Sequence, residues 1–113
     1  MVRKIKRIIA WLLVLWEDED WDHAYLFRIL RFKLSSMEKF FRTRGMLANR
    51  EVNALQMKRC MIIIDRLIAD DYYENIMRGP FKHKWYEREC RDKNNDLKYL
   101  FDQIRKHVLT WWD

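Results

Sequence analysis

Apolar residues recur along most of the chain at steps of three and four residues, which is the period of one face of an α-helix. This spacing predicts a first helix over Val2–Trp16 with one face buried. It predicts a second helix over about 21–43, whose wide apolar face should contact two neighbours. Asp20 or Asp22 is expected to cap the N-terminus of this helix. A third helix should begin after Asn49, a residue type that caps helix N-termini, and reach about Tyr72.

The second half of the chain ends in the most regular pattern of the sequence. Gly79 and Pro80 predict a break, after which a long helix can begin with Pro80 in its first turn. A seam of the coiled-coil type is predicted along this helix at Cys90, Asn94, Leu97, Phe101, Ile104, Val108 and Trp111. Gly45 is expected to end the second helix in the left-handed conformation.

These patterns predict an all-α fold, a single three- or four-helix bundle with a long C-terminal helix. The chain has 113 residues, enough for one hydrophobic core but not for two. It contains only two Gly and one Pro, whereas a sheet protein of this size needs many tight turns. We therefore expect one helical domain over residues 1–113, with a basic amphipathic N-terminal helix at 1–16 and the bundle core at 20–110.

The positive charge of the chain is concentrated in segments. Residues 1–16 carry four cations and no acid, residues 17–23 carry five acids, and the formal net charge of the whole chain is +6. A basic start before the apolar run 8–16 resembles a signal peptide, but acids occupy the place of a cleavage site and the run is too short to span a bilayer. The chain is therefore expected in the cytoplasm, and a helix lying in a membrane interface is the less favoured alternative.

The two cysteines, Cys60 and Cys90, have no metal-ligand spacing and fall where apolar helical faces should run. Both are predicted to be buried, reduced thiols, in agreement with a reducing compartment.

No arrangement of residues predicts chemistry. A di-metal carboxylate bundle needs Glu-x-x-His on two helices, whereas this chain has a single Asp20-x-x-His23, so His23 is expected on the surface. Ser35 and Ser36 lack the strand-to-helix turn that exposes a nucleophilic serine. We expect no catalytic residue, no metal, no cofactor and no enzymatic activity.

Basic residues on two helices are candidates for a surface that binds protein or nucleic acid. On the second helix and the start of the last helix these are Arg28, Arg31, Lys39, Arg42, Arg44, Lys84, Arg88 and Arg91. Cations next to aromatic residues can follow a phosphate backbone, although acids four residues before several cations of the last helix predict ordinary helix salt bridges.

Tryptophan residues near the C-terminus predict a protein interface. Trp111 and Trp112 are adjacent, so they cannot both point into one core, and Trp85 lies close to the basic residues of the last helix. Exposed Trp near Arg is typical of interface hot spots. A protein partner is therefore expected, and a homo-oligomer is an alternative.

Acidic residues gather near the end of the third helix, at Asp65, Asp70, Asp71 and Glu74. Acids at a helix C-terminus oppose the helix dipole. We expect them on a solvated surface, where arginines of another helix pair with them.

Three segments resemble small helical accessory proteins encoded by tailed bacteriophages and prophages. The first comprises Trp21, Asp22, Tyr25, Leu26, Ile29, Leu30, Lys33, Leu34, Met37 and Phe40. The later two comprise Asp65, Arg66, Leu67, Ile68, Asp70 and Tyr72, and Asp96, Leu97, Leu100, Phe101, Ile104, His107, Trp111, Trp112 and Asp113. The resemblance implies a phage accessory protein in the cytoplasm of an infected bacterium and transfers no site residue, because the function of that group is undefined.

The expected function is binding without catalysis. A small phage protein without chemistry should act by occupying a surface of a host or phage protein, for example a host-defence nuclease in the manner of an anti-CRISPR protein. The alternatives are a nucleic-acid-binding protein and a virion or scaffold component that self-assembles through the seam of the last helix.

Overall fold

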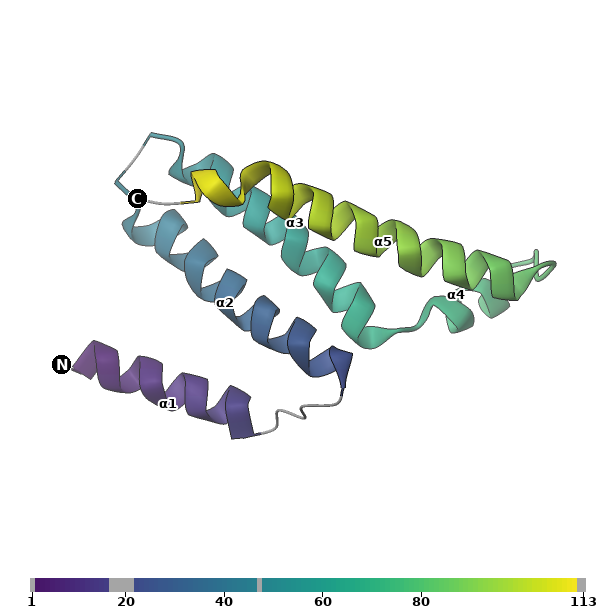
Figure 1. The fold of residues 1–113 in the computed structure, drawn as a ribbon, viewed down its shortest axis with the longest axis horizontal. Helices are drawn as coiled ribbons and strands as arrows, with labels where there is room; N and C mark the ends of the chain where they lie inside the picture. Colours follow the sequence, from purple (N-terminus) through teal and green to yellow (C-terminus); the bar gives the residue numbers. More distant parts are fainter. Residues whose placement is uncertain (1, 17–21, 47, 112–113) are drawn as a thin grey trace.

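The computed structural model describes residues 2–16, 22–46 and 48–111 and confirms the all-α class (Figure 1). The described elements are the helices α1 (Val2–Trp16), α2 (His23–Arg44), α3 (Arg50–Ala69), α4 (Tyr72–Arg78) and α5 (Trp85–His107), and the short 3-10 helix η1 (Val108–Thr110). The N-cap of α2 is the predicted Asp22, whose side chain accepts a hydrogen bond from the backbone N–H of Ala24 at 2.9 Å.

The hydrophobic core lies between α2, α3 and α5. Its buried members are Phe27, Leu34 and Phe41 of α2, Ala54, Met57, Cys60, Ile63 and Ile64 of α3, Leu100 of α5, and Trp111. In Figure 1, α3 lies between α2 and α5, so it packs on both sides. Removing these apolar side chains from water is the main driving force for the fold.

Helix α1 does not bury the face that its sequence predicts. No residue of α1 is buried, and the helix lies along α2 on the side away from α3 (Figure 1). It contacts α2 through Trp11, whose ring meets that of Phe32 edge-on at 4.7 Å. Because α3 already covers the buried stripe of α2, α1 reaches only the remaining flank of that helix. The predicted burial is therefore wrong.

Helix α5 is rotated about its axis relative to the predicted seam. Leu100 and Asp96 face the core, whereas Phe101 is 51% exposed and Val108 is exposed as well. Leu97 and Ile104, two members of the predicted seam, are only partly buried against the core. The buried stripe includes a carboxylate, which no apolar pattern can indicate. The predicted seam is therefore displaced from the stripe that α5 buries.

The two cysteines lie in different environments. Cys60 is fully buried, as predicted, and its burial raises the pKa of the thiol. Cys90 is exposed, so the prediction of a second buried thiol is wrong. The reason is the rotation of α5, which places this part of the predicted seam on the outward side.

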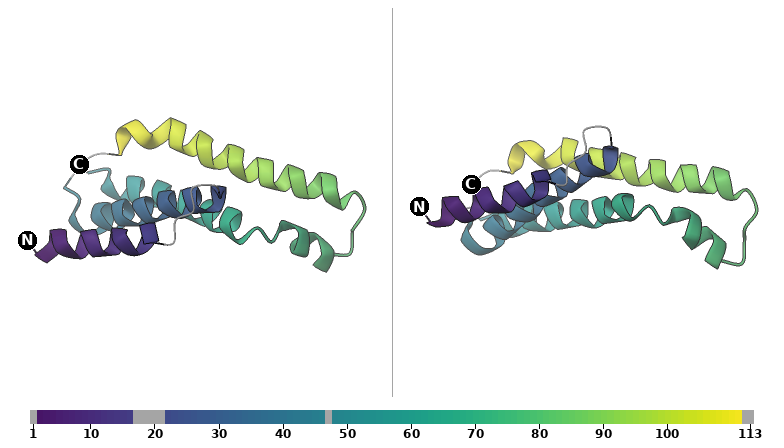
Figure 2. Two further views of the ribbon diagram at one scale, coloured as in Figure 1. Left: turned by 60° about the horizontal axis from the view of Figure 1, so that its bottom comes forward. Right: turned by 90° about the horizontal axis from the view of Figure 1, so that it is seen from below.

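The connection between α3 and α5 differs from the predicted one. The left-handed Asp70, with φ 50°, ends α3, and the additional helix α4 follows. Asp71 and Glu74 therefore lie at the start of α4, where a negative charge interacts favourably with the helix dipole. Helix α5 begins after Lys84, also at positive φ, so Pro80 lies outside the helix that it was predicted to start. Figure 2 shows α4 and the start of α5 extending beyond the N-terminal end of α2.

Gly45 ends α2 for a reason of space. Its backbone is extended, with φ −63° and ψ 143°, so the predicted left-handed conformation is wrong. A Cβ atom added to Gly45 would lie 2.7 Å from the carbonyl oxygen of Phe41 and 2.9 Å from Cβ of Arg50. The close approach of α2 and α3 at this turn leaves no room for a side chain.

Substitution of Gly45 by alanine should lower the free energy of unfolding by about 1–3 kcal/mol, because backbone must move to admit the methyl group. Gly79→Ala is the matched control, since its added Cβ would meet the carbonyl oxygen of Ile76 at 3.4 Å and its φ is negative. That control should change stability by less than about 1 kcal/mol. Urea denaturation of both variants measures the difference, and equal losses would contradict the steric explanation.

Candidate functional site

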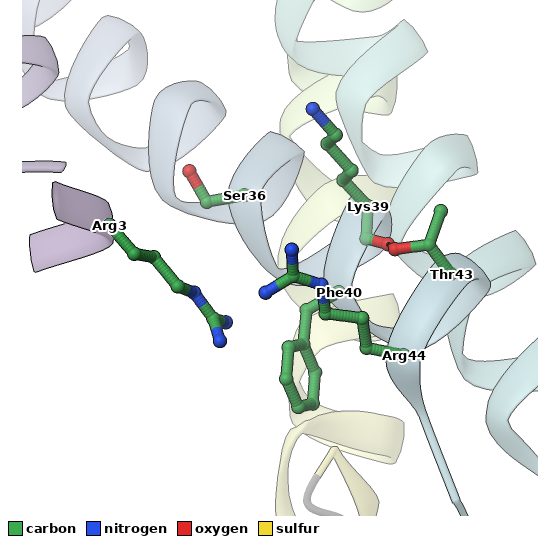
Figure 3. Close-up of a pocket in the computed structure, with 6 residues that line it drawn as sticks. All are labelled: Arg3, Ser36, Lys39, Phe40, Thr43 and Arg44. Carbon is green, nitrogen blue, oxygen red and sulfur yellow. Dashed lines mark hydrogen bonds between the residues drawn. The ribbon is translucent and has the colours of Figure 1, made fainter. Parts of the chain in front are cut away.

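A concave feature lined by several basic residues lies between α1 and α2. We define the α1–α2 groove by its cations and one aromatic ring: Arg3 and Arg7 of α1, and Lys33, Lys39, Phe40 and Arg44 of α2. The part lined by Arg3 and Arg44 has a volume of about 460 Å³. Figure 3 shows Arg3 extending from α1 towards the Phe40 side chain, with the Arg44 guanidinium on the same side.

The groove forms because helical spacing places its residues on facing sides of two helices. Arg3 and Arg7 are four residues apart and therefore lie on the same side of α1. On α2, Lys33, Phe40 and Arg44 follow the same type of spacing. Only the packing of α1 on α2 brings the two sets together.

The cations of the α1–α2 groove have no carboxylate partner among the described residues. All five side chains are exposed at the mouth of the groove. Five positive charges in one concave region produce a positive potential that raises the local concentration of anions. The groove is therefore suited to an anionic ligand.

Two cations of the predicted basic surface on α2 form ion pairs within the chain. Arg31 donates two hydrogen bonds to Asp65 of α3, at 2.8 and 3.3 Å. Arg42 donates to Glu38 within α2 at 3.0 Å. These two ion pairs interrupt the basic surface that the sequence predicts along α2.

The remaining predicted cations lie apart from the groove or make other contacts. The Arg28 guanidinium lies over the ring of Tyr25, 4.7 Å from its centroid. Lys84, Arg88 and Arg91 lie at the N-terminal end of α5. This end is on the opposite side of the molecule from the C-terminal end of α2 (Figure 1). Of the eight predicted basic residues, the structure thus brings Lys39 and Arg44 together and adds Lys33, Arg3 and Arg7.

The tryptophans predicted at a protein interface differ in position. Trp111 is only 8% exposed, its indole N–H donates to Oε1 of Gln56 at 2.9 Å, and it belongs to the core cluster while also lining the floor of the α1–α2 groove. Trp85 is exposed and packs edge-on against Tyr73, with ring centroids 5.2 Å apart. Trp112 lies outside the described residues.

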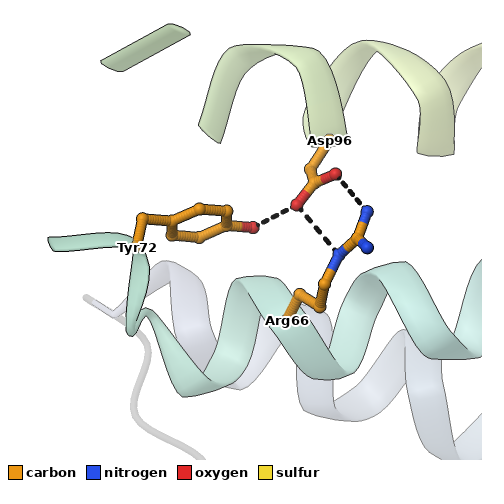
Figure 4. A network of polar contacts seen from close by, with 3 residues as sticks. All are labelled: Arg66, Tyr72 and Asp96. Carbon is orange, nitrogen blue, oxygen red and sulfur yellow. Dashed lines mark hydrogen bonds and ion pairs between the residues drawn. The ribbon is translucent and has the colours of Figure 1, made fainter. Parts of the chain in front are cut away.

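A polar network that the sequence did not predict joins α3, α4 and α5 (Figure 4). The buried Asp96 carboxylate accepts hydrogen bonds from Nε and Nη2 of Arg66, at 3.2 and 2.5 Å, and from the Tyr72 hydroxyl at 2.5 Å. Burial, followed by the hydrogen bond to Asp96, raises the pKa of Tyr72 above its usual range. Because the three groups satisfy one another, we assign this network to stability.

Above about pH 10, the ordinary pKa of tyrosine, the free energy of unfolding should fall. The folded state retains the Tyr72 proton there and the unfolded state loses it, so this contribution is complete below that pH and declines above it by up to about 1.4 kcal/mol per pH unit. Tyr72→Phe should flatten the decline and cost about 1–2 kcal/mol at neutral pH. Urea unfolding at a series of pH values measures both, with the exposed Tyr73→Phe as control. An unchanged alkaline slope in Tyr72→Phe would contradict the assignment.

The acidic cluster at the end of α3 is paired across helices. Asp65 pairs with Arg31 of α2, the type of partner that was predicted. Asp70 instead pairs with a lysine, Lys93 of α5, at 2.8 Å. Hydrogen bonds to Asp70 and Glu89 raise the pKa of Lys93. These residues contribute to surface pairing between helices.

Comparisons with known proteins give no assignment. No family model matches the chain, and no curated protein or solved structure is significantly similar to it. Within the described ranges, no group of His, Cys, Asp and Glu side chains is arranged to hold a metal ion. The side chain of His23 is 82% exposed, as predicted, and Asp20 lies outside the described residues. No helix in that part of the chain is both long and apolar enough to cross a membrane.

Proposed function

We propose that the protein is a non-enzymatic binding protein that receives an acidic segment of a partner protein in the α1–α2 groove. The observation that carries this proposal is that five cations line the two adjoining parts of this groove without a carboxylate partner in the described residues. Each new pair between such a cation and a partner carboxylate adds charge-assisted hydrogen bonds, which are stronger than neutral ones.

The shape of the basic surface favours a short acidic segment over nucleic acid. A nucleic-acid backbone presents phosphates at regular intervals and is best followed by a continuous row of cations. The pairs Arg31–Asp65 and Arg42–Glu38 interrupt that row on α2. A compact pocket with Phe40 at its wall suits a few carboxylates with a neighbouring apolar side chain. Nucleic acid is therefore the rival occupant that the experiment must exclude.

The biological setting of the proposal comes from the sequence resemblance. It predicts a host or phage protein as the partner, a host-defence nuclease being one example, in the cytoplasm of an infected bacterium. In this view α2, α3 and α5 form a three-helix bundle that supports the groove. Self-assembly stays a second prediction, because Phe101 of α5 and Val108 of η1 leave apolar groups exposed.

Affinity capture from a bacterial lysate tests the proposal. The wild-type chain should retain a stoichiometric protein that salt releases. The double variant Lys39→Glu, Arg44→Glu should retain at least about tenfold less, because reversing close charge pairs typically costs more than 1.4 kcal/mol. The control double variant Lys84→Glu, Arg91→Glu changes the net charge equally at the other end of the molecule and should retain the partner.

Three outcomes would contradict this function. The first is the absence of any stoichiometric partner, and the second is an equal loss in both double variants, which would indicate a general effect of charge. The third is a capture that nuclease treatment abolishes, with a gel shift that weakens steeply as salt increases. That last result would assign the groove to nucleic acid.

A further inference from the structure

Helix α1 presents an apolar surface that no other described element covers. Eight of its side chains are each more than half exposed, from 51% for Leu15 to 89% for Trp16. They are Val2, Ile5, Ile8, Ile9, Leu12, Leu13, Leu15 and Trp16, and we call them the outer face of α1. A contiguous exposed apolar surface on a folded protein usually marks an interaction site.

Most of the outer face lies away from the side by which α1 contacts α2, and at one edge Ile8, Leu12 and Leu15 line a hollow that Lys33 of α2 also lines. At about 100° per residue, its eight residues span an arc of about 160° around the helix axis. Trp11, Val14 and Ala10 lie outside this arc and are the partly buried residues of the helix. The chain therefore docks α1 by its less apolar side and directs its more apolar side outward.

Charge on α1 indicates which partner the outer face suits. The helix carries Arg3, Lys4, Lys6 and Arg7 and no acidic residue. On the helical projection Lys4 and Lys6 flank the two edges of the arc, while Arg3 and Arg7 line the α1–α2 groove. Lysines beside an apolar arc can extend their ammonium groups to lipid phosphates while their stems rest on the apolar layer.

The length of α1 determines how it can meet a bilayer. Its 15 residues give a helix of about 22 Å, short of the roughly 30 Å hydrocarbon core. None of the described helices is long and apolar enough to cross a membrane. Contact with a bilayer therefore requires the helix to lie along the surface.

We propose that α1 is an interfacial helix that binds an anionic lipid surface, with its outer face in the acyl boundary and Lys4 and Lys6 at the headgroup phosphates. A second copy of the chain is a poorer occupant, because pairing the outer faces would bring together two helices that each carry four positive charges and no negative one. An anionic lipid surface satisfies both the charge and the width of the arc. This inference goes beyond the proposed function and does not depend on it.

Co-sedimentation of the full chain with vesicles tests this inference. Vesicles of phosphatidylcholine mixed with phosphatidylglycerol should bind the protein, and vesicles of phosphatidylcholine alone should bind it much more weakly. Ile9→Glu should lower the partition coefficient roughly tenfold or more, because it places a charge where an apolar side chain would enter the acyl boundary. The double variant Lys4→Gln, Lys6→Gln should lower it roughly thirtyfold on the anionic vesicles.

The control is Val52→Glu on α3, since Val52 is 56% exposed and Ile9 is 53% exposed. It adds the same acid at a similarly exposed apolar residue and should leave vesicle binding unchanged. Urea denaturation should show that all these variants stay folded, because none of the substituted residues belongs to the core.

Absence of binding to the anionic vesicles, or equal binding by Ile9→Glu and the wild-type chain, would overturn the inference. A concentration-dependent mass in light scattering that Ile9→Glu abolishes, without vesicle binding, would assign the outer face to a second copy instead. Vesicle binding is measured on the purified chain without a protein partner, and affinity capture is judged by a protein that co-purifies and by variants outside the outer face. Failure of one proposal therefore leaves the other to its own experiment.

Discussion

Replacement of Leu100 by alanine is expected to lower the free energy of unfolding by about 3 kcal/mol. Leu100 is fully buried and is the member of the core cluster that α5 contributes. Its truncation removes apolar contacts and leaves a cavity that tightly packed neighbours fill only in part. Because this residue joins α5 to the rest of the core, the loss should appear as a lower urea midpoint without a change in slope.

The adjacent residue supplies the control for this prediction. Phe101 belongs to the seam that the sequence predicts but is 51% exposed in the structure. Phe101→Ala should therefore cost less than about 1 kcal/mol, although it removes a larger side chain. A larger loss in Phe101→Ala than in Leu100→Ala would mean that α5 packs by its predicted seam and would contradict the observed rotation.

Replacement of Trp111 by alanine should cost about 3–4 kcal/mol. The side chain is buried in the core cluster, and its indole N–H donates to Gln56. Alanine therefore creates a large cavity and leaves the Gln56 oxygen without this donor. Thermal and urea denaturation should both show this loss of stability, because Trp111 packs the segment after α5 against the core and donates a hydrogen bond to Gln56 of α3.

Two further variants separate the parts of the Trp111 contribution. Trp111→Phe keeps an aromatic ring in the core but loses the hydrogen bond, so its cost should be about 1–2 kcal/mol. Trp85→Ala removes an exposed indole and should cost less than about 1 kcal/mol. If Trp111→Ala were no more destabilising than Trp85→Ala, the assignment of Trp111 to the core would be contradicted.

The two proposals use different sides of α1. Arg3 and Arg7 line the α1–α2 groove, whereas Ile9 and Leu13 belong to the outer face. If the outer face bound a lipid surface, Arg3 and Arg7 would still lie on the side of α1 that lines the α1–α2 groove. The same helix could then hold the protein at a membrane and contribute cations to a groove that receives a partner.

Interactions local in the chain were predictable from the sequence. The apolar period alone indicated helices at α1, α2 and α3, and a cap at the start of α2 followed from Asp22. On α3 the buried residues Ala54, Met57 and Ile64 form a stripe that follows the helical period. The period, the cap and this stripe depend on residues only a few positions apart, so the sequence displays them directly.

Only the tertiary structure decided which apolar faces are buried. Two apolar faces, those of α1 and of the α5 seam, were predicted to be buried, yet the outer face of α1 and Phe101 are exposed. The α1–α2 groove and the Asp96 network likewise join residues that are far apart in the chain, such as Tyr72 and Asp96. Helical hydrogen bonds join residues four apart, so the local sequence determines where the helices form. The face that each helix buries depends on which neighbouring helices pack against it, and the local pattern carries no information about those neighbours.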